Sequence, residues 1–212
     1  SLNQYTGRLI GKGDEDPTIF NPTQLNTDQW ASVFSRAGMK AMILTTKHHE
    51  GFSLWDTKYS NHQVMSSPFK KDIVKMAAES AKKFGLKFGI YYSMYDAHHP
   101  DFATEKYNQF VDNQLTELLT NYGDIFQVWL DGYTPKLVRK MMDKKGYKYP
   151  LDRWIKLIKK IQPDAITPYN TRLFGHEDGI VPKDISNIND GRWRPAEAVT
   201  TTRYFIGKYT AF

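Results

Sequence analysis

The sequence of 212 residues contains no cysteine. Disulfide bonds, thiol catalysis and thiolate metal sites are therefore excluded. No apolar run approaches the roughly 18 residues that a membrane-spanning helix needs, so we expect no transmembrane segment and no membrane partner. With 40% hydrophobic and 25% charged residues, the composition excludes a disordered or fibrous protein. The chain also has no internal repeat and no Gly/Ser linker, and its length favours one domain over two.

Charge gives little indication of a partner. Basic residues outnumber acidic ones by 29 to 23, and a net charge of +6 could suggest nucleic acid. The basic residues are scattered, however, and the densest cluster, Lys136–Lys148, is typical of a solvated helix and loop. We therefore expect no nucleic-acid partner.

The chain opens at Ser1 with polar residues and shows no signal peptide. Two interpretations remain open. The protein is cytosolic, or the start of the chain has been removed. In the second case, a signal peptide in the missing part would direct the protein to the periplasm or outside the cell.

Helical and strand patterns alternate along the chain. Apolar residues at helical spacing predict helices over residues 27–36, 72–84, 104–121 and 151–161, the first of them capped by Thr27. Short apolar runs predict strands over residues 41–44, 87–91, 125–130 and 165–167. This alternation predicts an α/β fold with a parallel sheet and right-handed crossovers.

Polar side chains follow each predicted strand at its carboxyl end. They are Lys47–Glu50, Tyr91–Ser93, Asp131 and Tyr169–Asn170. Reactive residues at this end are typical of a (β/α)8 TIM barrel. A doubly wound sheet would share the feature, but the chain lacks a Gly-rich phosphate loop. The expected fold is therefore an α/β, TIM-barrel-like domain over residues 1–212.

The segment KHHEGF contains two adjacent histidines, His48 and His49. Neighbours on a strand point to opposite sides, so we expect that the two do not bind one metal together. One interpretation is a surface turn with a histidine facing the core. The nearby aromatic residues Phe52 and Trp55 favour a sugar site instead, since such a site combines an apolar wall with polar donors.

Asp131 follows a strand of mostly apolar residues. A partly buried carboxylate at the mouth of a barrel is a candidate nucleophile, although a turn or helix cap before Gly132 would also explain it. Glycoside hydrolysis requires a second carboxylate, and the candidates are Glu177 and Glu197, although each taken alone fits an ordinary loop residue better. The pair His98–His99 could suggest a metal site, but its polar surroundings favour a loop.

Four segments together resemble the α-L-fucosidases of glycoside hydrolase family 29. The resemblance covers roughly residues 5–180, and its motifs are FNPTQLNTDQW, TTKHHEGFSLWDTKYS, KFGLKFGIYYS and NQLTELLTNYGDIFQVWLDG. The last motif is most similar to the branch that prefers branched α-1,3 and α-1,4 fucosides.

The resemblance implies a retaining exo-α-L-fucosidase that acts on oligosaccharides or glycoconjugates without metal or cofactor. It implies that Asp131 is the nucleophile and Glu177, in GHEDG, the acid/base. The remaining residues that it places at the substrate are His48, His49, Trp55, Tyr91 and Glu197.

The chain departs from the family at both ends. Ser1 falls after the family's first strand and its histidine, and the sequence diverges after the RWRPAE segment that holds Glu197. About five or six of the eight strands of a barrel are then present. Open sheet edges predict self-association. An inactive fucosidase remnant or a fucose-binding protein remains the alternative function.

Overall fold

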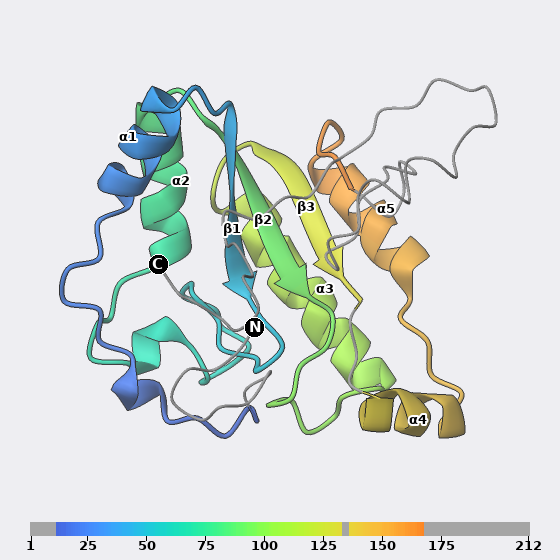
Figure 1. Cartoon of the computed structure of the whole chain (residues 1–212). Helices are drawn as coiled ribbons and strands as arrows, with labels where there is room; N and C mark the ends of the chain where they lie inside the picture. The colour runs from blue at the N-terminus through green and yellow to red at the C-terminus, as the bar shows by residue number, and fades with distance from the viewer. Residues whose placement is uncertain (1–11, 133–135, 168–212) are drawn as a thin grey trace, which may run out of the picture. The chain divides into compact units, whose positions relative to one another are not determined.

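The computed structural model describes residues 12–132 and 136–167 (Figure 1). Three parallel strands form a sheet in the order β1 (Ala41–Lys47), β2 (Lys87–Ser93), β3 (Ile125–Asp131). Ile166 adds a parallel bridge to Gln127 on the far side of β3. The predicted parallel α/β arrangement is therefore confirmed for this part of the chain.

The helices follow the predicted alternation closely. Two short 3-10 helices, η1 (Pro17–Ile19) and η2 (Val64–Ser66), accompany five α-helices in the described residues. The α-helices are α1 (Thr27–Arg36), α2 (Ile73–Lys83), α3 (Glu105–Thr120), α4 (Lys136–Lys144) and α5 (Leu151–Ile161). Helix α4 occupies the basic segment that was expected to be a solvated helix and loop.

The N-cap of α1 differs from the prediction. Asn26, not Thr27, is the capping residue, and its side chain accepts a hydrogen bond from the Gln29 amide at 3.0 Å. The Thr27 hydroxyl instead meets the Ser80 hydroxyl of α2 at 2.9 Å. Both residue types cap helices well, so the choice depends on this contact between helices.

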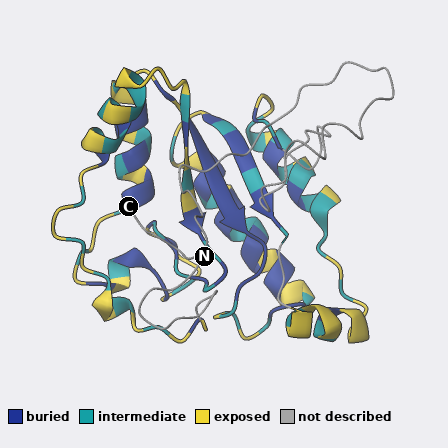
Figure 2. Ribbon diagram, viewed as in Figure 1, coloured by how far each residue is buried: buried dark blue, intermediate teal, exposed yellow. Residues whose placement is uncertain are grey.

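The hydrophobic core lies between the sheet and its helices. Figure 2 shows β2, β3 and the inner sides of α2 and α3 as mostly buried, whereas β1 is buried in part. Ile90 and Tyr92 of β2 belong to this core, and the Tyr92 hydroxyl donates to Gln114 of α3. Contributions from the helices include Val74, Ala77, Leu115, Leu118, Trp154 and Ile158. Burial of these apolar side chains stabilises the layer by about 25 cal/mol per Å².

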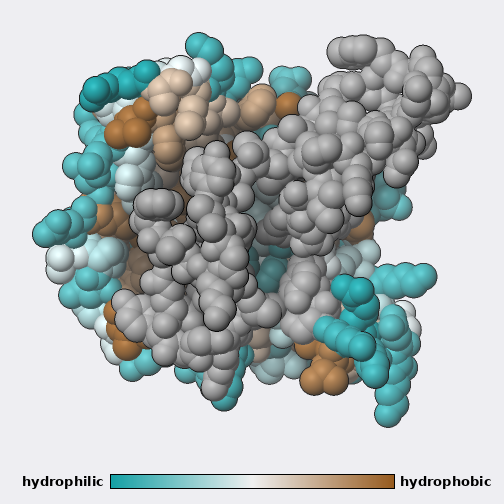
Figure 3. Space-filling view, in the orientation of Figure 1, coloured by the Kyte–Doolittle hydropathy of each residue, from teal (hydrophilic) through white to brown (hydrophobic). Residues whose placement is uncertain are grey.

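A few large apolar side chains remain exposed. Figure 3 shows hydrophobic residues where the end of α1 and the start of β1 lie. Val33 and Met39, from these segments, are about half exposed, and Ile43 of β1 is partly exposed. Self-association through such surfaces stays a prediction.

The described residues do not form a closed barrel. They contain three strands and the bridge at Ile166, and the predicted residues Tyr169–Asn170 lie outside them. None of the helices in the described ranges is long and apolar enough to cross a membrane.

Candidate functional site

The carboxyl ends of β2 and β3 bring Asp131 and Ser93 together. The two residues are partners in the parallel register, and Tyr91 lies two positions before Ser93. Since side chains alternate along a strand and paired residues share a face, all three belong to one face of the sheet. The pattern of apolar strand followed by polar end therefore produces a local cluster.

Asp131 is the central member of this cluster. It is the last residue of β3 and only 6% exposed. Its Oδ2 accepts a hydrogen bond from the Tyr91 hydroxyl and lies 3.5 Å from His49 Nε2. A donated hydroxyl stabilises the ionised form of a carboxylate.

The hydrogen bonds of His49 determine which nitrogen carries its proton. Nδ1 lies 2.7 Å from Ser93 Oγ, and the Ser93 hydroxyl donates its one proton to the Tyr95 carbonyl at 2.7 Å. Ser93 Oγ must then accept from His49, so Nδ1 is the donor. Burial, followed by the charge of His48, lowers the pKa of His49 to about 4. In this neutral tautomer, Nε2 presents its lone pair near Asp131.

The prediction that His48 and His49 point to opposite sides is wrong. Their ring centroids lie 4.0 Å apart, and His48 also stacks on Tyr91 at 5.6 Å with an interplanar angle of 10°. Strand β1 ends at Lys47, and the Gly51 amide closes a turn on the His48 carbonyl. Strand alternation therefore does not extend to these two residues.

Trp55 is not brought to this cluster. Its side chain is fully buried in the hydrophobic core, and its indole N–H donates to Glu117 of α3 at 3.0 Å. A ring enclosed in this way has no open face for a sugar. The structure therefore corrects the expectation that Trp55 forms an aromatic wall beside the substrate.

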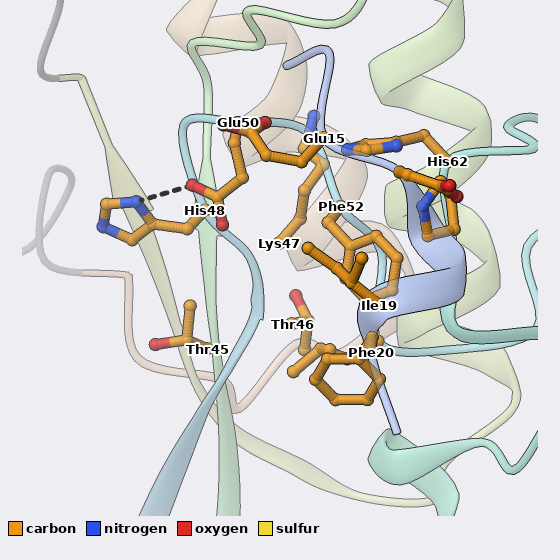
Figure 4. A pocket seen from close by; sticks show the side chains of 13 residues that line it. Glu15, Ile19, Phe20, Thr45, Thr46, Lys47, His48, Glu50, Phe52 and His62 are labelled. Carbon is orange, nitrogen blue, oxygen red and sulfur yellow. Dashed lines mark ion pairs between the residues drawn. The ribbon is translucent and has the colours of Figure 1, made fainter. Parts of the chain in front are cut away.

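A cavity of about 250 Å³ lies beside the end of β1 (Figure 4). Figure 4 shows Ile19, Phe20 and Phe52 grouped on one side, and His48 with Glu50 on the other. The Phe20 and Phe52 ring centroids are 5.2 Å apart, and His48 Nδ1 lies 3.4 Å from Glu50 Oε2. His48 thus borders both the cavity and the Asp131 cluster, whereas Asp131 itself does not line the cavity.

The contacts of several neighbours of the site were not identified from the sequence. Ser93 was noted only as a residue at the end of a strand, although its spacing of two from Tyr91 already indicated a shared face. Lys47 and Asp96 form a buried ion pair at 2.8 Å, 49 positions apart. No local sequence pattern reveals a contact at such a separation.

The remaining candidates divide into two groups. Glu177 and Glu197 lie outside the described residues. His98 and His99 lie in the loop after β2, as expected. The His98 ring stacks on His62 at 4.2 Å, and its Nδ1 donates to the Gly13 carbonyl. Within the described ranges, no group of three or more His, Cys, Asp or Glu side chains is arranged to hold a metal ion.

Comparison with known proteins extends these observations. Residues 14–193 match the family model described as alpha-L-fucosidase. The chain is 40% identical over 186 residues to alpha-L-fucosidase 1 of Arabidopsis thaliana. That alignment covers 84% of this chain and 36% of the plant protein. The chain thus spans about a third of the length of this relative.

Solved structures of members of this family are also similar to the chain. A glycoside hydrolase 29 family member from an unknown rumen bacterium is 37% identical, with a TM-score of 0.71, over 84% of this chain and 32% of that one. An alpha-L-fucosidase of this family from Bacteroides thetaiotaomicron, solved as a trapped covalent intermediate with 2-fluoro-fucosyl fluoride, is 28% identical. Its TM-score is 0.63, over 71% of this chain and 36% of that one.

Proposed function

Since this chain belongs to the α-L-fucosidase family, we propose that it is a glycoside hydrolase that releases terminal α-L-fucose from oligosaccharides or glycoconjugates with retention of configuration. The observation that carries this proposal is the buried carboxylate of Asp131 at the end of β3, held by the Tyr91 hydroxyl beside His49. A strand-end carboxylate in a polar cluster is suited to nucleophilic attack.

The reaction is a double displacement. An oxygen of Asp131 forms a bond to the anomeric carbon while the glycosidic bond breaks, and the leaving oxygen takes a proton from Glu177. Water then attacks the same carbon, gives a proton to Glu177 and releases Asp131. This stereochemistry requires the two carboxyl groups to lie about 5–5.5 Å apart.

Tyr91 and the histidines prepare the site for this step. The hydroxyl of Tyr91 orients Asp131 and stabilises its ionised form. Neutral His49 offers Nε2 as an acceptor for a sugar hydroxyl, with its ring fixed through Ser93. His48, which lies against both His49 and Tyr91, is suited to a second hydroxyl. Glu197 is a further candidate for substrate contact.

The same family membership supports a (β/α)8 barrel as the complete fold. Three parallel strands joined by helices, with polar residues at their carboxyl ends, are the repeating unit of such a barrel. The covalent intermediate named for the Bacteroides thetaiotaomicron fucosidase supports a fucose-containing substrate and a nucleophilic step. No observation favours the alternative of an inactive or purely fucose-binding protein.

Hydrolysis of an aryl α-L-fucoside tests the proposal. We expect the chain to release fucose and Asp131→Ala to lose at least about 10³-fold in kcat, because the nucleophile is removed. Asp124→Ala is the matched control, since Asp124 is an exposed aspartate at the other end of the same strand. Equal activity of the two variants would overturn the assignment of Asp131.

A further inference from the structure

We propose that the buried ion pair of Lys47 and Asp96 positions the residues of the site. It does so by fixing the loop that follows β2. The two members of the pair lie 2.8 Å apart, and Asp96 belongs to the loop that follows β2. The pair fixes the loop segment Met94–Ala97, and this segment binds the main chain of both His49 and Asp131. The inference rests on the proposed function for its catalytic consequence only.

Lys47 is enclosed on the helix side of the sheet. Its side chain is 0% exposed, and Nζ lies 2.8 Å from Asp96 Oδ2. Nζ also faces the rings of Tyr92 at 4.4 Å, Phe110 at 5.2 Å and Tyr107 at 5.9 Å. Ring faces attract a cation, so the ammonium group is held from several directions.

Asp96 connects this lysine to the loop. Its side chain is 2% exposed, and its second oxygen, Oδ1, accepts from the backbone amides of His98 at 2.9 Å and His99 at 3.0 Å. Gly51 packs so closely that an added Cβ would lie 2.3 Å from Oδ1. The position of the Asp96 carboxylate is therefore fixed, and the backbone of the loop is hydrogen-bonded to it.

The loop then holds the two site residues by their main chain. The Met94 amide donates to the Asp131 carbonyl at 2.9 Å, and the Ala97 amide donates to the His49 carbonyl at 2.9 Å. In addition, the Tyr95 carbonyl accepts from Ser93, whose oxygen orients the His49 ring. Movement of this loop would displace His49 relative to Asp131.

An ion pair at this position serves geometry more than stability. Well-packed apolar side chains can often replace a buried ion pair with no loss of stability. They cannot accept hydrogen bonds from the His98 and His99 amides. Replacing the ion pair with apolar residues would therefore remove the hydrogen bonds that fix the shape of the loop.

Two double variants separate geometry from charge. Lys47→Met with Asp96→Asn removes both charges but keeps an acceptor oxygen for the two amides. Lys47→Met with Asp96→Leu removes the charges and the acceptor at similar volume. Single variants would leave one buried charge without its partner and could fail to fold.

We expect the Asn variant to keep kcat within a few-fold of the unmodified chain. The Leu variant should lose at least about tenfold in kcat with little change in KM, because small displacements of catalytic groups are costly. The Leu variant should melt at a lower temperature because the His98 and His99 amides lose their acceptor, so kcat is compared well below both melting temperatures. Equal kcat values in the two variants would overturn the inference.

A second measurement does not depend on activity. Two-bond ¹H–¹⁵N correlation spectra report the tautomer of His49, assigned with a His49→Gln variant. The Nδ1-protonated pattern should persist in the Asn variant and change in the Leu variant. An unchanged His49 pattern in the Leu variant would contradict the inference, even if kcat fell. If the unmodified chain released no fucose, the proposed function would be wrong. The spectrum of His49 would still test whether the ion pair positions this ring.

Discussion

Two buried carboxylates at the same end of the sheet have different partners. Asp96 is paired with a lysine at 2.8 Å and accepts two backbone amides. Asp131 accepts the Tyr91 hydroxyl and lies 3.5 Å from a histidine ring whose pKa is lowered to about 4. The nearby lysine lowers the pKa of Asp96 against the opposing effect of burial. Burial alone therefore does not identify a reactive carboxylate.

We propose a structural role for Asp96 and a catalytic role for Asp131. The negative charge of a carboxylate that lies at hydrogen-bond distance from a cation is already balanced by that cation. A carboxylate held by a hydroxyl beside a neutral imidazole can still respond to a substrate that brings new partners. Variants at the two positions should therefore affect different properties.

After loss of the proposed nucleophile Asp131, the next largest effect is expected from Glu177, the proposed acid/base. Glu177→Ala should lower kcat by about 10²–10⁴-fold on substrates with poor leaving groups, the usual contribution of a general acid. With an activated aryl fucoside, whose leaving group departs without an acid, added azide should restore turnover, because azide attacks the fucosyl-enzyme without needing a general base. Glu197→Ala should not be rescued.

Kinetic assays with and without azide check this prediction, and Glu79→Ala, at an exposed position of α2, is the control. Rescue that occurred only in Glu197→Ala would reverse the roles of the two glutamates.

The next effect concerns stability. Asp96→Ala leaves the buried Lys47 ammonium without its partner and should lower the free energy of unfolding by about 3–5 kcal/mol. Asp131→Asn should lower it by about 1 kcal/mol or less, because an amide oxygen can still accept from Tyr91. Urea denaturation of both variants measures the difference. Similar losses would remove the distinction between the two carboxylates.

The smallest effect is a pH dependence of stability. Burial lowers the pKa of His49 to about 4, and burial also lowers the pKa values of His62 and His99. An unfolded histidine takes up its proton near pH 6.5, so acidification below that value favours the unfolded chain. The stabilisation by the neutral histidines should be fully present above about pH 6.5, and the free energy of unfolding should decrease as the pH falls toward 4.

Thermal melts between pH 7.5 and 4.5 test this dependence. Since the uptake of protons by three histidines drives the loss, His49→Gln should reduce it in part. A melting temperature that rose on acidification would contradict the sign of the effect.

The positions of helices and strands could be predicted because they depend on local patterns. Mostly apolar runs lead to the strand ends at Lys47, Ser93 and Asp131, and the polar residues at these ends indicated the site. The N-cap of α1 was misplaced by one residue because Asn26 and Thr27 are both good capping residues.

Contacts between distant residues could not be read from the sequence. Trp55 was expected at the sugar because of its place in a motif, but its bond to Glu117 spans 62 positions and places it in the core. The orientation of His48 and His49 depends on where β1 ends, and the register shift between Thr45 and Lys47 is not visible in the residue pattern. Tertiary packing determines both the burial of Trp55 and the orientation of the two histidines.

The most direct test of the central claim is covalent trapping of Asp131. The chain is incubated with 2-fluoro-fucosyl fluoride, whose fluoride leaves without help from an acid, and is then digested for peptide mass spectrometry. We predict a fluorofucosyl ester on the peptide that contains Asp131, and we expect this label to be lost when the Asp131→Asn variant is treated in the same way. A label on another carboxylate, or its persistence in that variant, would contradict the account.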